Sequence, residues 1–298
     1  MTAPRQLLVG ATYLVTRRCS ERRLFLRPSA EVNAIFRYVL AVAAERYQIE
    51  VHAFCVLSNH FHLVVTDPHA RLPDFHRCLD SLVARATNRA LGRWESFWDP
   101  ASYSAVRLED PEAILEKMVY VLANPVAAGL VRRGTEWPGL WSDPSALDGP
   151  PQLVERPEGF FRKAGALPAT AQLRVVRPPG FEADEDLAGR LLRLLRVEED
   201  WAAARLAGQG RSFLSAARVL ALKPTARPAT VEPRRRLRPR IASRNPETRL
   251  QALRRLKAFA RRYQEAFEAW TAGAHDAVFP PGTWLMRVRH AATCEAAG

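Results

Sequence analysis

The chain has 298 residues, of which 48% are hydrophobic and 25% charged. This ordinary globular composition excludes a wholly disordered or fibrous chain, and no stretch approaches the ~18 consecutive apolar residues of a membrane span. The formal net charge of +13 favours a polyanionic partner such as nucleic acid. Four cysteines without a C-x-x-C pair indicate neither a zinc ribbon nor a disulfide framework. We therefore expect a cytoplasmic, nucleoid-associated protein with no membrane contact.

The first part of the chain alternates between strand-like and helix-like patterns. The predicted elements are a strand over 8–16, a helix that begins after Ser29, a β-hairpin over 50–57 and 61–66, a helix over 72–91, a strand over 104–108 and a helix over 111–123. We expect the last helix to end before Pro125, because a residue that precedes proline is disfavoured in helical conformation. This order predicts an α+β fold, the ferredoxin-like split βαβ arrangement, whose antiparallel sheet leaves one face free to bind a partner.

The remainder of the chain is predicted to be a mostly helical, basic C-terminal extension. Helices are expected over 184–208 and 211–222, and a long amphipathic helix is expected to start at Asn245. The predicted division of the chain is a first domain over 1–145, a helical extension over 146–223, a Pro/Arg-rich linker over 224–244, and a basic amphipathic helix with a tail over 245–298.

Most of the net positive charge lies in residues 227–262, which hold 13 basic residues against Glu232 and Glu247. Such a localised basic run predicts contacts with a DNA backbone. A solvated linker with no partner is the alternative. The candidate DNA-binding residues in the segment are Arg234, Arg235, Arg236, Arg238, Arg240, Arg254 and Arg255.

Two histidines flank a phenylalanine at the start of the second hairpin strand, as His60-Phe61-His62. Because residues i and i+2 of a strand point to the same face, both imidazoles project together while Phe61 points toward the packed side. Two imidazoles on one face can chelate a divalent ion, although such a pair by itself is a weak signal.

The helix over 111–123 carries a polar stripe on an otherwise apolar surface. Glu116, Tyr120 and Asn124 recur at i, i+4 and i+8, and Lys117 lies near the same face. Tyr120 and Asn124 are about 6 Å apart along the axis, so a phenol and an amide oxygen can address one site. An ordinary amphipathic core tyrosine is the alternative for Tyr120.

Three stretches together resemble the single-tyrosine HUH transposases, in particular the REP-associated tyrosine transposase branch. They are residues 13–18 (YLVTRR), 53–65 (AFCVLSNHFHLVV) and 120–131 (YVLANPVAAGLV), in the order in which that family has them. The resemblance covers roughly residues 5–145 and does not extend to the C-terminal half.

The resemblance implies a DNA strand transferase that nicks and rejoins single-stranded DNA at hairpin or repeat elements. Tyr120 would be the nucleophile that forms a 5′-phosphotyrosine, and His60 and His62 would bind Mg²⁺ or Mn²⁺. Asn124 falls where related enzymes place a third metal ligand, commonly glutamine. Lys117 would face phosphate. The partner would be single-stranded or hairpin DNA, and the protein would be a monomer or homodimer.

Two other functions are compatible with these residues. One is a domesticated relative that binds DNA hairpins without cutting them. The other is a metal-dependent phosphodiesterase that uses water, in which Tyr120 is structural. Formation of a covalent protein–DNA adduct distinguishes the transferase from both alternatives.

Overall fold

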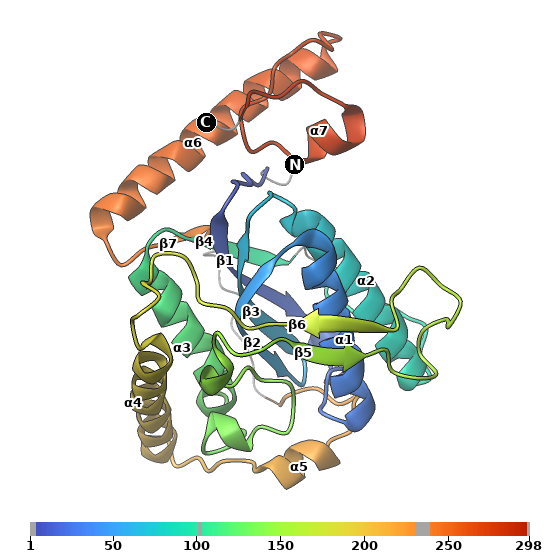
Figure 1. Ribbon diagram of the computed structural model, residues 1–298, viewed down its shortest axis with the longest axis vertical. Helices are drawn as coiled ribbons and strands as arrows, with labels where there is room; N and C mark the ends of the chain where they lie inside the picture. Colours follow the sequence, from blue (N-terminus) through green and yellow to red (C-terminus); the bar gives the residue numbers. More distant parts are fainter. Residues whose placement is uncertain (1–3, 101–102, 230–238, 297–298) are drawn as a thin grey trace.

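The computed structural model describes residues 4–100, 103–229 and 239–296 (Figure 1). Its first part contains the elements predicted from the sequence. They are β1 (Ala11–Arg18), α1 (Ala30–Tyr47), β2 (Glu50–Leu57), β3 (His60–Asp67), α2 (Leu72–Ala90), β4 (Ser104–Leu108) and α3 (Pro111–Ala127). The rest of the chain forms β5 (Gln152–Glu155), β6 (Thr170–Leu173), α4 (Leu187–Gly208), α5 (Ala216–Ala221), β7 (Ile241–Ala242), α6 (Pro246–Thr271) and α7 (Leu285–His290).

The central sheet has the strand order β2-β3-β1-β4-β7. The pairs β2–β3, β3–β1 and β1–β4 are antiparallel, so the predicted α+β class and the split βαβ order are confirmed. The two-residue strand β7 pairs in parallel with β4 at the edge of the sheet. These residues fall in the predicted linker over 224–244, because two residues show no strand periodicity.

Helices cover both faces of this sheet. On one face α1 and α2 pack over Phe61, Leu63 and Val65 of β3. On the other face α3 packs against β2 and β3, and α4 packs on the outside of α3 (Figure 1). The expectation that one face stays free is therefore wrong. The second face is apolar, because it carries side chains such as those of Cys55 and Val64, and α3 packs on it.

Helix α3 begins at a strong cap and ends later than predicted. The carboxylate of Asp110 accepts a hydrogen bond from the backbone N–H of Ala113 at 2.7 Å, which satisfies one of the free donors of the first turn. The helix continues through Pro125 to Ala127, so the predicted end before the proline is wrong. Burial of Pro125 and of Val126 within the last turn offsets the hydrogen bond that proline cannot make.

Residues 146–223 share the hydrophobic cores of the first domain. The hairpin of β5 and β6, which the sequence analysis missed, buries Val154 and Leu173 in the α1–α2 core. Leu187 and Leu191 of α4 join the core that contains the buried residues of α3. The predicted boundary at residue 145 thus does not separate two cores, and the proposed four-part division stays a prediction.

The C-terminal helices α6 and α7 form a separate small core around Phe259, Tyr263 and Phe279. This part is tied to the N-terminal segment, because the N–H of Leu7 donates to the carbonyl of Gly282 at 3.0 Å. Gly282 has a φ of 91°, and a Cβ there would lie 2.9 Å from the carbonyl oxygen of Leu7, so only glycine fits this contact. Across the described part of the chain, no helix combines the length and the apolar character that a bilayer crossing requires.

Candidate active site

The histidine pair lies on the face of β3 that α3 covers. Phe61 is fully buried on the opposite face, as predicted from strand alternation. The rings of His60 and His62 lie 4.8 Å apart between centroids, at an interplanar angle of 88°. The two imidazoles therefore converge at one end of the strand.

Neighbouring side chains hold the Nδ1 atom of each histidine. His62 Nδ1 lies 2.7 Å from the hydroxyl of Thr16, which is its partner across the β1–β3 ladder. His60 Nδ1 lies 2.6 Å from the Asn59 side-chain oxygen, which only accepts hydrogen bonds, so this contact places the His60 proton on Nδ1. Contacts of this kind fix the ring orientation and the tautomer of metal-binding histidines.

His62 is the more buried of the two histidines, at 5% exposure. Its Nε2 atom is buried and has no hydrogen-bond partner. Burial holds the pKa of His62 well below its usual range, and electrostatic interaction with His60 and Arg18 lowers it further. The imidazole is therefore neutral at neutral pH, which is the form that donates a lone pair to a metal. A buried and unpaired Nε2 is costly unless a ligand satisfies it.

Tyr120 lies on α3 and faces the histidine pair of β3. Its ring centroid lies 5.4 Å from that of His62, at an interplanar angle of 74°. Tyr120 is 46% exposed, whereas the apolar positions around it on α3 are buried. The structure thus brings the predicted nucleophile and the predicted histidine pair together, with the tyrosine side chain open to solvent.

Asn124 lies one helical turn after Tyr120, and its side chain is 9% exposed. No three His, Cys, Asp or Glu side chains within the described ranges gather into a cluster suited to a metal ion. The role of Asn124 as a third ligand beside His60 and His62 stays a prediction. Two imidazoles and one amide oxygen suit Mn²⁺ somewhat better than Mg²⁺.

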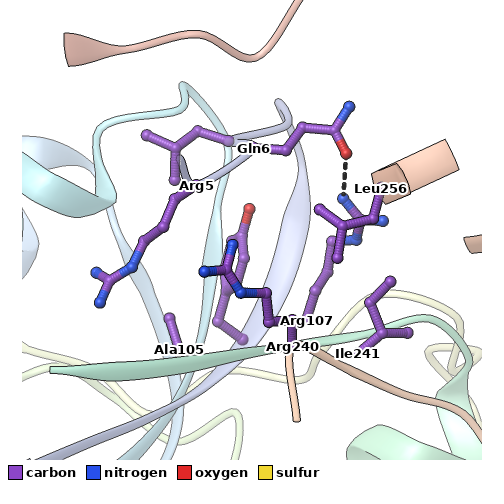
Figure 2. Close-up of a pocket in the computed structure, with 9 residues that line it drawn as sticks. Arg5, Gln6, Ala105, Arg107, Arg240, Ile241 and Leu256 are labelled. Atoms are coloured by element: carbon purple, nitrogen blue, oxygen red, sulfur yellow. Dashed lines mark hydrogen bonds between the residues drawn. The ribbon is translucent and has the colours of Figure 1, made fainter. Parts of the chain in front are cut away.

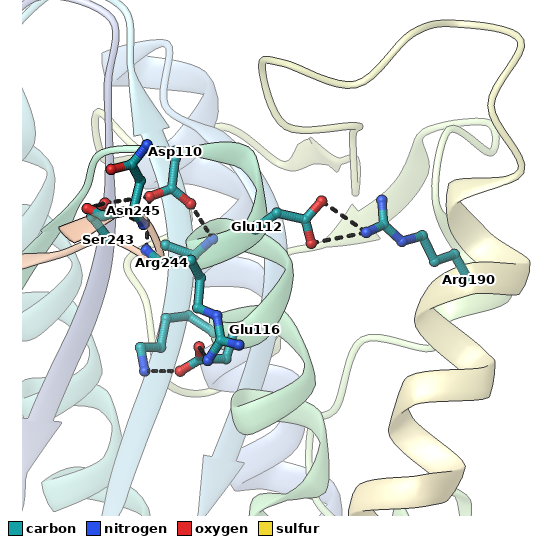
Figure 3. A network of polar contacts seen from close by, with 9 residues as sticks. Asp110, Glu112, Glu116, Arg190, Ser243, Arg244 and Asn245 are labelled. Carbon is teal, nitrogen blue, oxygen red and sulfur yellow. Dashed lines mark hydrogen bonds and ion pairs between the residues drawn. The ribbon is translucent and has the colours of Figure 1, made fainter. Parts of the chain in front are cut away.

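The start of α3 is fastened to the C-terminal segment by a polar network (Figure 3). Asp110 accepts hydrogen bonds from the hydroxyl of Ser243 and, at 2.8 Å, from the N–H of Arg244. Burial raises the pKa of Asp110, but these hydrogen bonds and that of the helix cap outweigh burial and hold the pKa below its usual range. Arg244 also reaches Glu116 at 3.3 Å, and Glu116 pairs with Lys117 at 2.6 Å. Lys117, a predicted phosphate contact, is thus partnered within the protein.

The predicted DNA-binding arginines occupy different environments. Arg234, Arg235, Arg236 and Arg238 lie outside the described residues. Arg240 is half-buried beside a narrow cavity of about 30 Å³ (Figure 2). Its guanidinium donates to the carbonyl of Pro4 at 2.8 Å. Burial and the charge of Arg5 lower the pKa of Arg240. Arg254 is exposed on α6, and Arg255 lies 3.5 Å from Glu109. Their role in binding DNA stays a prediction.

Sequence reasoning missed the residues that support the site. Thr16 and Asn59 orient the histidines, and Asp110 and Ser243 fasten α3. The position of Asn59 next to His60 was a usable signal. The contact between Thr16 and His62 depends on the β1–β3 register, which no local pattern specifies.

Comparison with known proteins gives partial structural similarities. No protein-family model matches the chain, and no curated protein matches it. Among solved structures, the chain is similar to a REP-associated tyrosine transposase bound to a REP hairpin, with 20% identity and a TM-score of 0.39, over 45% of this chain and 78% of that one. It is also similar to a putative transposase from Deinococcus radiodurans R1, with 23% identity and a TM-score of 0.28, over 36% and 85%.

Both structural neighbours are transposases. The first is described as a REP-associated tyrosine transposase, the family that the sequence motifs resemble, and the second as a putative transposase. Each similarity covers less than half of this chain, so neither establishes its function.

Proposed function

We propose that this protein is a single-strand DNA transposase that nicks and rejoins DNA at hairpin or repeat elements through Tyr120. The observation that carries the proposal is the assembly of Tyr120, His62 and His60 in one cluster, in which the tyrosine is exposed and the His62 Nε2 atom is buried without a partner. A core tyrosine with a structural role would be buried, and Tyr120 is not.

In the proposed reaction, the phenolic oxygen of Tyr120 attacks a DNA phosphorus. The bond from phosphorus to the 3′ oxygen breaks, a 5′-phosphotyrosine forms, and the leaving 3′ oxygen takes up a proton to give a 3′-hydroxyl. One phosphodiester replaces another, so the step is reversible and needs no nucleotide cofactor. Attack by a 3′-hydroxyl on the phosphotyrosine rejoins a strand and releases the phenol.

His60, His62 and Asn124 would hold a divalent ion, Mg²⁺ or Mn²⁺. The orphaned Nε2 of His62 and the hydrogen-bonded Nδ1 atoms fit this role. When bound, such an ion supplies Lewis-acid polarisation of the phosphodiester and orients it. Thr16 and Asn59 keep the imidazoles in place, and the position of Tyr120 on a capped helix keeps the nucleophile within reach.

The test is incubation of the protein with single-stranded hairpin DNA labelled at its 3′ end, the end that stays on the protein, and Mn²⁺, followed by denaturing electrophoresis. A labelled band that migrates with the protein is expected for the wild type and is expected to be absent for Tyr120→Phe. The matched control is Tyr47→Phe, which removes the same atom from the end of α1. An adduct that persists in Tyr120→Phe, or cleavage without any adduct, would contradict the proposal.

A further inference from the structure

A second candidate binding site lies on the opposite side of the sheet from Tyr120. It is a groove of about 850 Å³ lined by α2 and by the loop of residues 156–169. Figure 1 shows the course of this loop from β5 to β6. Its floor includes Leu82 and Ala86 of α2, whose side chains belong to the α1–α2 core. A volume of this size is in the range of ligand sites, about 300–1,000 Å³.

Both walls of the groove carry positive charge. Arg85 and Arg89 are exposed one turn apart on α2, and Arg162 and Lys163 are exposed on the loop that faces them. None of the described residues that line the groove is acidic. Outside the lining, Glu158 lies 3.7 Å from Lys163, in a pair whose side chains are 89% and 85% exposed, and such exposed pairs contribute little. The groove is therefore built to receive an anion or a chain of anions.

The same groove contains two phenylalanine rings. Phe160 and Phe161 line it and are half-buried. Gly159, with a φ of 81°, makes the turn that leads into them. The Phe161 ring packs on Tyr38 of α1 at 5.2 Å between centroids, so the aromatic wall is supported from the core.

The loop is held in shape by its own hydrogen bonds. The Arg156 guanidinium donates to the carbonyls of Arg162, Lys163 and Leu167 at 2.9–3.2 Å. The Tyr38 hydroxyl donates to the carbonyl of Pro168 at 2.6 Å. These contacts fix the position of the cations relative to the rings before any ligand arrives, which lowers the entropic cost of binding.

We propose that this groove binds a segment of single-stranded DNA, with phosphates on the two pairs of cations and bases against the phenylalanine wall. Cationic grooves with aromatic side chains are the general means of holding single strands, since every base offers a π-face. A duplex keeps its bases paired and stacked, and therefore offers the rings nothing to stack on. The inference goes beyond the proposed function, because the groove shares no residue with the Tyr120 site and would bind DNA whether or not Tyr120 cleaves it.

The test measures binding of a fluorescent 20-nucleotide oligothymidylate by anisotropy at several salt concentrations. The full chain carries Tyr120→Phe and the buffer contains EDTA, so that cleavage plays no part. In Arg85→Ala/Arg89→Ala, the slope of log affinity against log salt is expected to flatten by about 1.4, because each single-strand phosphate contact contributes about 0.7. The loop variant Arg162→Ala/Lys163→Ala is expected to give a similar change without altering α2.

The matched control is Arg205→Ala/Arg218→Ala, which removes two exposed cations from α4 and α5. Its slope is expected to stay unchanged. Phe160→Leu keeps an apolar side chain but removes the ring, and it is expected to weaken binding of the oligonucleotide on the order of 10-fold while leaving binding of a duplex unchanged.

An unchanged slope in both groove variants would overturn the proposal, as would an equal loss in the control. Full affinity in Phe160→Leu, or an equal loss on duplex, would overturn the assignment to single strands. Failure of adduct formation in the separate cleavage assay would overturn the role of Tyr120 and would leave this result intact.

Discussion

The histidine–tyrosine cluster and the basic C-terminal segment differ in how their functional groups are held. His62 is buried on a central strand, and its Nδ1 is fixed by Thr16 of the next strand. By contrast, Arg244 and Arg255 are exposed and form ion pairs with Glu116 and Glu109. The Arg244–Glu116 pair, in which both side chains are exposed, contributes only about 0–1 kcal/mol, so a phosphate can replace the Glu116 carboxylate at little cost. The candidate catalytic side chains thus lie on packed strands and helices. The basic side chains lie on the surface, where a DNA phosphate can replace a carboxylate partner.

The largest effect is expected at the histidines. His60→Ala and His62→Ala should each reduce metal-dependent adduct formation by more than about 100-fold, because loss of a ligand exceeds the 10- to 100-fold cost of losing a supporting contact. Binding of hairpin DNA should remain. Denaturing electrophoresis measures the first quantity and anisotropy the second. His290→Ala, exposed at the end of α7, is the control. Undiminished adduct formation in EDTA would show that no metal acts at this site.

A second prediction concerns pH and the buried His52, which joins the sheet to residues 146–223. Its ring bonds the carbonyl of Val176 and the hydroxyl of Thr66, each at 2.8 Å. Burial lowers the pKa of His52 to about 4. In the unfolded chain His52 is protonated below about pH 6.5, whereas in the folded chain it is protonated only below about pH 4. The unfolded state therefore binds more protons between these values, and the free energy of unfolding, which is fully present above pH 6.5, falls as the pH is lowered toward 4.

The expected loss is about 3 kcal/mol of unfolding free energy between pH 6.5 and 4. His52→Gln can keep both hydrogen bonds without titrating, and its unfolding free energy should lack this pH-dependent part. Urea denaturation at several pH values measures both proteins. Parallel pH profiles for the two would contradict the assignment.

A third prediction concerns Asp110, which joins the start of α3, the helix that carries Tyr120, to the basic C-terminal segment. Asp110→Ala removes the α3 cap and the acceptor for Ser243 and Arg244, so it should cost about 1–2 kcal/mol of stability. It should also speed hydrogen exchange in residues 240–246. Asp186→Ala, which removes the cap of α4 alone, serves as the control and should leave exchange in 240–246 unchanged. Equal exchange in the two variants would show that Asp110 does not hold the C-terminal segment.

The smallest effect is expected from a single exposed arginine. Arg254→Ala on α6 should flatten the salt dependence of duplex-stem binding by about 0.9, the contribution of one phosphate contact. The preference for particular DNA sequences should persist, because phosphate contacts position the protein on the DNA, whereas contacts with base edges determine which sequence is bound. Arg193→Ala on α4, where the arginine is 70% exposed, is the control. Identical slopes for the variant and the wild type would assign Arg254 to a solvated surface.

Elements with a local sequence pattern could be predicted, whereas short strands and contacts between distant segments could not. Strand β4 and helix α2 were located to within one residue, and the apolar periodicity of α2 matches its buried residues. The short strands β5, β6 and β7 were missed, since four or two residues carry too little periodicity. The convergence of His60, His62 and Tyr120 was expected from their motifs. The contact of Thr16 with His62 was not expected, because it depends on the β1–β3 register. The contact of Asp110 with Ser243 was not expected either, because the two residues lie more than 130 positions apart.

The most direct measurement is the mass of the peptide that contains Tyr120 after reaction with hairpin DNA and Mn²⁺. The protein is denatured, digested with a nuclease and a protease, and the peptides are mapped by mass spectrometry. The account predicts that the Tyr120 peptide carries a 5′-phosphodeoxynucleotide joined to the tyrosine oxygen. A nucleotide on any other residue, or cleaved DNA beside an unmodified Tyr120 peptide, would contradict it.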